Sequence, residues 1–231
     1  MYQGEDLIIA TGAPGCRWSG SVRAIQSHVA INTTDESADR IYGKPGKRPN
    51  DLGWHRGAYW GPGHQFGDRF DRMDLLTKDQ IVAEFQAPFS DWAPGYKIIK
   101  SHWFSYHLPQ LREMFPRAKL IGFWMPDDFC FEWWHKVGGW KITYPHYDWY
   151  QNDQRMQQQI AIENQNIQKF FNLEQLSLTD IYARLGIGEQ LHTEEFLLNR
   201  DKKLLDLAAS RNESAMQILN QTVFRTFTGV L

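Results

Sequence analysis

Cysteine is scarce in this chain, which has only Cys16 and Cys130 among its 231 residues. Two cysteines are too few for a disulfide framework, and the Cys and His positions do not have the spacing of a zinc site. We therefore expect a protein of a reducing compartment that holds no metal.

Strong charge and long apolar runs are missing as well. The formal net charge is -2 at pH 7, so no overall charge draws the chain to nucleic acid or to anionic membranes. No apolar stretch approaches the ~20 residues that a helix needs to cross a bilayer. We expect a soluble, cytoplasmic protein whose partners are neither nucleic acid nor membrane.

The first apolar segment, residues 7–10, breaks into a loop rich in Gly and Ser and then into a helical pattern. Val22, Ile25 and Val29 recur at helical spacing, and Ser19 is placed to cap the helix. Backbone N–H groups at the start of a helix bind phosphate or sulfate when a cation is near. This pattern predicts an anion-binding loop, with an ordinary strand-to-helix turn as the alternative.

The loop departs from the phosphate-loop pattern of nucleoside triphosphatases, G-x-x-x-x-G-K-[ST]. Arg17 and Trp18 stand where that pattern has its second Gly and its Lys. The sequence therefore argues against an ATP or GTP hydrolase.

Strands and helices alternate further along the chain. Thr77 begins a capping box ahead of a short helix, and residues 96–100 and 119–124 have the composition of buried parallel strands. Pro126 starts another helix, and residues 148–231 are predicted to be mostly helical. This order predicts an α/β fold, in which helices flank a parallel sheet.

A long irregular segment, residues 32–76, lies within the predicted core of residues 5–147. Loops of this length inside compact domains are usually functional, so we predict an ordered lid or binding loop in a single domain of residues 1–231. The alternative is a loop whose Trp residues only cover the core. The candidates for contact with an acceptor molecule in this segment are His55, Arg56, Trp60 and His64.

The ends of the predicted strands are the places to look for a site, because ligands of open parallel sheets bind at the C-terminal strand ends. Three segments qualify: the loop of residues 14–21, the tripeptide Lys100–Ser101–His102, and residues 124–128.

These segments resemble, in the same order, three motifs of the P-loop-fold sulfotransferases that use 3′-phosphoadenosine 5′-phosphosulfate. The family's Pro-Lys/Arg-Ser-Gly-Thr-Thr loop is similar to Pro14 and Arg17 followed by Ser19–Gly20–Ser21. Its Lys-Thr/Ser-His motif matches Lys100–Ser101–His102, and its Arg-Asn-Pro-x-Asp motif resembles residues 124–128. The resemblance covers roughly residues 7–137.

The resemblance implies a P-loop-like sheet and transfer of a sulfuryl group, without a metal, to a hydroxyl of a small molecule or glycan. It implies that His102 removes the proton of the acceptor hydroxyl and that Arg17 stabilises the leaving group. Lys100 is expected either to stabilise the leaving group or to orient His102. The implied contacts with the donor are Pro14, Gly15, Arg17, Trp18, Ser19, Gly20 and Ser21.

Two positions depart from the family pattern. Trp124 replaces the Arg, and Glu132 the Ser, that hold the 3′-phosphate of the donor. A carboxylate repels a phosphate, and the missing Arg removes a bidentate contact. The alternatives are therefore a non-catalytic protein that binds a glycan or a protein partner, and a small-molecule kinase, for which the loop lacks its Lys.

Overall fold

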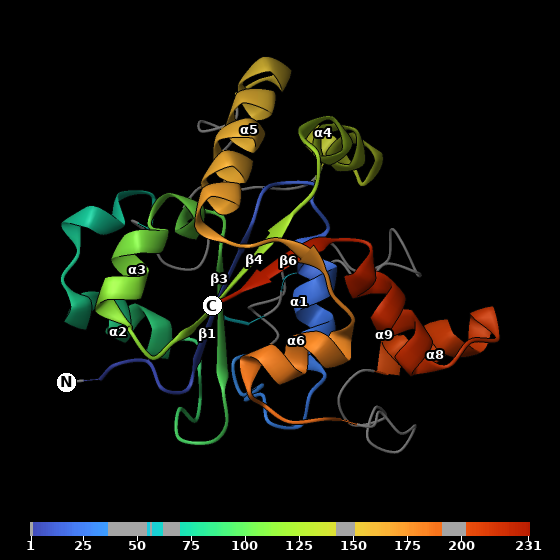
Figure 1. Ribbon diagram of the computed structural model, residues 1–231, viewed down its shortest axis with the longest axis horizontal. Coiled ribbons are helices and arrows are strands. Elements are labelled where there is room, and N and C mark those ends of the chain that lie inside the picture. The colour runs from blue at the N-terminus through green and yellow to red at the C-terminus, as the bar shows by residue number, and fades with distance from the viewer. Residues whose placement is uncertain (1, 37–54, 56, 62–69, 142–150, 191–201) are drawn as a thin grey trace.

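The computed structural model describes residues 2–36, 55, 57–61, 70–141, 151–190 and 202–231. Its centre is a mixed six-stranded sheet in the order β2-β3-β1-β4-β6-β5 (Figure 1). In chain order the strands are β1 (Leu7–Gly12), β2 (Tyr59–Trp60), β3 (Lys97–Ser101), β4 (Lys119–Trp124), β5 (Glu174–Gln175) and β6 (Phe227–Val230).

Helices connect and cover the strands. The α-helices are α1 (Trp18–Gln26), α2 (Lys78–Gln86), α3 (Leu108–Met114), α4 (Asp127–Lys136), α5 (Asp153–Phe170), α6 (Leu178–Leu185), α8 (Lys202–Arg211) and α9 (Ala215–Phe224). Short 3₁₀ helices are η2 (Phe70–Leu75), η3 (Trp103–Tyr106) and η4 (Gly139–Lys141). Within the described ranges, none of these helices combines the length and the apolar character needed to cross a membrane.

The central strand β1 is buried along its whole length and pairs in parallel with β3 and β4. Continuous apolar runs of this kind are typical of strands that are covered on both faces. The strands predicted at residues 96–100 and 119–124 are confirmed as β3 and β4, and the predicted α/β class is confirmed.

The prediction of a purely parallel sheet is wrong, because β6 runs antiparallel to β4 and β5 runs antiparallel to β6. The signal for β6 is not local. Gly122 of β4 lies opposite Gly229 of β6, and a Cβ on either glycine would come within 2.5 Å of the ring or Cβ of Phe171. The two glycines therefore make room for Phe171, although glycine weakens a strand on its own.

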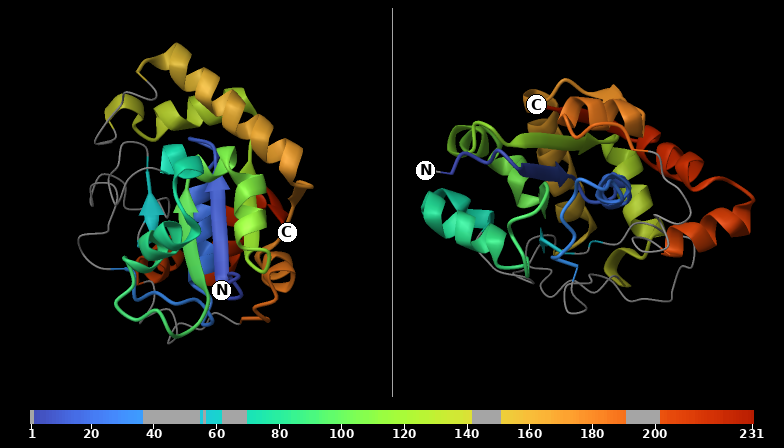
Figure 2. Two further views of the ribbon diagram at one scale, coloured as in Figure 1. Left: turned by 90° about the vertical axis from the view of Figure 1, so that its left-hand side faces the viewer. Right: turned by 90° about the horizontal axis from the view of Figure 1, so that it is seen from below.

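The helices form layers around the sheet. Helices α2 and α3 cover one face, and α1, α6 and α9 cover the other (Figure 1). Ile9 and Ile99 belong to the apolar cluster on the α2 and α3 side, and Ile8 and Ile98 to the cluster on the α1 side. Helix α5 crosses the end of the sheet toward which β1 points (Figure 2), so the C-terminal strand ends lie beneath it.

Candidate functional site

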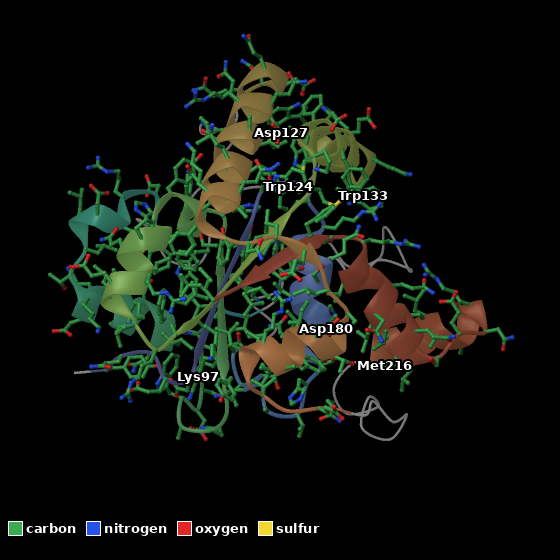
Figure 3. All side chains as sticks on the ribbon, viewed as in Figure 1. Lys97, Trp124, Asp127, Trp133, Asp180 and Met216 are labelled. Atoms are coloured by element: carbon green, nitrogen blue, oxygen red, sulfur yellow. The ribbon has the colours of Figure 1, made fainter. Side chains whose placement is uncertain are left out.

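The three segments singled out in the sequence meet at the C-terminal strand ends. Nδ1 of His102, which follows β3, lies 2.6 Å from the carbonyl oxygen of Gly12, the last residue of β1. Trp124, Asp127 and Trp133 lie at this same end, whereas Lys97 lies at the opposite end of the sheet (Figure 3). The loop after β1, the turn after β3 and the start of α4 thus surround one place.

The loop between β1 and α1 turns twice through left-handed backbone, with φ of 79° at Gly15 and 66° at Arg17. A Cβ on Gly15 would lie 1.9 Å from the carbonyl oxygen of Cys130 in α4. Only glycine therefore fits between this loop and α4.

The predicted cap at Ser19 is wrong, because α1 begins at Trp18 and its N-cap is Arg17, which makes no side-chain cap hydrogen bond. The left-handed Arg17 turns the chain so that its own carbonyl accepts hydrogen bonds from the backbone N–H groups of Gly20 and Ser21. The helix therefore starts without a hydroxyl cap.

The side chain of Arg17 lies flat on aromatic rings of α4. Its guanidinium carbon is 3.8 Å from the ring centre of Trp133 and 4.8 Å from that of Phe129, and the two rings are nearly parallel. Burial, and next the charge of Arg225, lower the pKa of Arg17. Stacking uses the face of a guanidinium and leaves its edge to donate hydrogen bonds. Nε is buried and has no hydrogen-bond partner among the described residues, so it is available to an anion.

His102 is held as one tautomer. A carbonyl oxygen can only accept, so Nδ1 carries the hydrogen that Gly12 receives, and the lone pair of the neutral ring is on Nε2. Ser101 fixes the turn, because its Oγ donates to the carbonyl of Trp60 at 2.8 Å and accepts from the N–H of Trp103 at 3.1 Å. The arrangement suits a general base acting through Nε2.

Aromatic rings enclose His102, which is 3% exposed. The ring centre of Trp18 lies 4.9 Å from that of His102, and those of His55 and Tyr59 lie 6.2 and 6.3 Å away. His55 stacks on Tyr59 at 3.8 Å. Burial, followed by the charges of His102 and Lys100, lowers the pKa of His55, so its ring is neutral at neutral pH.

Lys100 is buried in β3, where it pairs with Tyr59 on one side and Ala10 on the other. Its charge acts on Asp35, whose Oδ2 accepts the N–H of Ala58 at 2.6 Å. Burial raises the pKa of Asp35, and Lys100 opposes that shift. Asp35, which the sequence did not single out, therefore helps to balance the buried ammonium of Lys100.

Not every predicted loop residue is accessible. Pro14, Trp18, Gly20 and Ser21 are buried, whereas Gly15, Arg17 and Ser19 are half-buried. A donor would therefore reach the loop from the side of these last three residues.

The residues predicted to contact the acceptor do not lie together in the structure. His55 lies beside His102, but Trp60 packs against Phe70 and Phe85 in the apolar cluster on the opposite face of the sheet. Tyr59 and Trp60 are neighbours in a strand, so their side chains point to opposite faces. Arg56 and His64 lie outside the described residues.

The two departures from the family pattern differ in exposure. The ring of Trp124 meets Phe227 edge-on at 5.5 Å, whereas Glu132 of α4 is exposed. The carboxylate of Glu132 is therefore solvated, and its repulsion of an anion at the loop is screened by water.

Known proteins give no match. No family model matches the chain, and no curated protein and no solved structure is significantly similar to it.

Glu163 of α5 is a member of the site that the sequence analysis missed. Its Oε2 lies 3.6 Å from Nδ1 of His102, and its side chain is 0% exposed. A signal was present, because Glu163 interrupts the apolar stripe of Met156, Ile160 and Ile167. Burial raises the pKa of Glu163, and the neighbouring His102 opposes that shift.

The described side chains of the site are suited to an anion and not to a metal ion. In the part of the chain that the structure describes, no three His, Cys, Asp or Glu side chains are grouped so as to hold a metal ion. The group suited to an anion is the edge of the Arg17 guanidinium, whose Nε has no hydrogen-bond partner among the described residues.

Proposed function

We propose that this chain is a sulfuryl-transfer enzyme with a P-loop-like fold, which uses a donor of the 3′-phosphoadenosine 5′-phosphosulfate type and a hydroxyl acceptor. The observation that carries the proposal is the hydrogen bond from His102 to the carbonyl of Gly12. It sets a base with its lone pair on Nε2 beside the loop that leads into α1.

The strand order supports the placement of the donor. The chain passes from β1 to β2 and β3 on one side, and then crosses to β4 on the other side of β1. Such a switch point opens a crevice at the C-terminal ends of the strands, where ligands of α/β sheets bind. The loop carrying Arg17 follows β1 at this point.

His102 and Arg17 have separate roles in the proposed reaction. Nε2 of His102 accepts the proton of the acceptor hydroxyl while its oxygen forms a bond to sulfur and the bond from sulfur to the phosphate oxygen breaks. The guanidinium of Arg17 stabilises the charge that develops on the leaving phosphate. The products are the sulfate ester, the nucleotide bisphosphate and a proton left on His102.

The described part of the segment of residues 32–76 covers this proposed site, and residues 37–54, 56 and 62–69 of the predicted lid lie outside the described residues. Two of its described residues, His55 and Tyr59, stack beside His102. Together with Trp18 they limit access of water to the base.

A transfer assay with labelled donor and a panel of hydroxyl acceptors tests the proposal, with His102→Asn as the informative variant. The asparagine amide can still donate to Gly12 but has no group in the place of Nε2. We expect about 10²- to 10⁴-fold slower transfer, with binding of 3′,5′-adenosine bisphosphate unchanged. Full turnover by His102→Asn would contradict the role of this residue.

A second candidate is a binding protein without catalysis, whose aromatic residues recognise a glycan or a protein partner. The observation that favours it is the uncharged ring of Trp124, the last residue of β4, packed on Phe227. This candidate predicts no transfer and no affinity for the bisphosphate.

A further inference from the structure

Helix α5 presents three buried polar side chains to the strand ends, and two of them have partners. Oε1 of Gln159 accepts the hydroxyl of Tyr106 at 2.5 Å. Nδ2 of Asn164 donates to the carbonyl of Met125 at 2.8 Å. Both carboxylate oxygens of Glu163 lie beyond hydrogen-bond distance of any described residue, and His102 Nδ1 approaches one of them to 3.6 Å.

A buried carboxyl group in this position destabilises the ligand-free chain. A buried polar group without a hydrogen bond, and above all a buried charge, is costly. The flanking Ile160 and Ile167 show that the same stripe accepts apolar residues. At neutral pH, an apolar side chain at position 163 would therefore stabilise the folded chain more than Glu163 does.

We propose that Glu163 is a positioning residue for His102, which stabilises the imidazolium formed when Nε2 takes the proton of the acceptor. This inference rests on the proposed function. Glu163 itself exchanges no proton, because the Nδ1–H that its carboxylate faces is already hydrogen-bonded to the carbonyl of Gly12. The carboxylate acts on the positive charge of the imidazolium, which is shared over the whole ring. The proton leaves Nε2 for solvent once the product has gone.

Four described titratable groups near the pair, His55, Lys100, Cys16 and Cys130, carry no negative charge. His55, from the segment of residues 55–61, and Lys100, from β3, are basic groups on the same side as the ring of His102. Cys16 and Cys130 flank Glu163 from the loop and from α4. Burial raises the pKa of the Cys16 thiol and raises that of Cys130 to about 12, so both stay neutral.

The kinetic test uses Glu163→Gln, with Gln159→Met as the matched control one helical turn away on the same buried face. We expect Glu163→Gln to lower kcat about 10- to 100-fold with KM for the donor unchanged. The loss is smaller than the roughly 10⁴-fold known where a carboxylate also sets the tautomer, because Gly12 keeps that function. The acid limb of kcat/KM moves to lower pH, because a protonated His102 without Glu163 is less stable. Gln159→Met leaves the limb in place.

An NMR titration of histidine-labelled protein separates this inference from the proposed function, because it needs neither donor nor acceptor. We expect the His102 ring signals to titrate at lower pH in Glu163→Gln than in the parent chain. A shift in a chain without transfer activity would support the pairing and contradict the proposed function. Unchanged titration, or transfer at the parental rate by Glu163→Gln, would overturn the inference.

Discussion

The guanidinium carbon of Arg17 lies 3.8 Å from the ring centre of Trp133, so the cation of the first loop is anchored on α4. The same residue has a left-handed backbone with φ of 66°, a conformation that costs a non-glycine residue about 1–2 kcal/mol. Strain at a residue that also carries an available N–H group is typical of a functional loop.

Arg17→Gly and Arg17→Ala separate the two roles of this residue. Both variants lose the cation, and we expect both to bind 3′,5′-adenosine bisphosphate at least about tenfold more weakly. Only alanine retains the strained backbone, so Arg17→Ala should be about 1 kcal/mol less stable to urea than Arg17→Gly. Equal stability of the two variants would contradict the left-handed loop.

Gly15→Ala tests the contact between the loop and α4, with Gly188→Ala as its control. Both glycines have positive φ, but a Cβ at 188 meets no described residue within 4 Å, whereas one at 15 meets the Cys130 carbonyl at 1.9 Å. We expect about 1 kcal/mol of destabilisation at 188 and at least about 3 kcal/mol at 15. Urea denaturation measures both, and similar losses would show that the loop does not approach α4.

Glu163→Gln should raise stability at neutral pH. Burial raises the pKa of Glu163 in the folded chain, so the folded state binds a proton more tightly than the unfolded state. Binding of this proton adds to the free energy of unfolding. The added stability is fully present below about pH 4.5, the ordinary pKa of a glutamate, and is lost as pH rises through the folded-state pKa. Denaturation curves at several pH values should show the gain of Glu163→Gln at pH 7 to 8 shrinking in acid. A variant less stable than the parent at pH 7 would contradict this.

The local signals in the sequence predicted local structure well. The capping box at Thr77 is present, and a second one begins α6 at Ser177, within the residues 148–231 that were predicted to be mostly helical. Continuous apolar runs identified β1, β3 and β4. Strand β6 was missed because its pairing depends on Phe171, which packs over Gly122 and Gly229 from a distant part of the chain.

The sequence predicted those parts of the site that lie at the ends of the parallel strands. Parallel strands end at one edge, so His102 and the loop after β1 were expected to be neighbours, and His102 indeed contacts Gly12. The position of Trp60 follows from the pairing of β2 with β3, which no local pattern predicts. Glu163 comes from a helix that crosses the strand ends, and only tertiary packing brings it to His102.

The measurement that tests the central claim most directly is a calorimetric titration of the protein and of Arg17→Ala with 3′,5′-adenosine bisphosphate, with ATP, with and without magnesium, as the comparison. The account predicts micromolar binding of the bisphosphate, about -8 kcal/mol, that is at least about tenfold weaker in the variant. Absence of binding by the parent chain, or tighter binding of magnesium ATP, would contradict a sulfuryl-donor site at this loop.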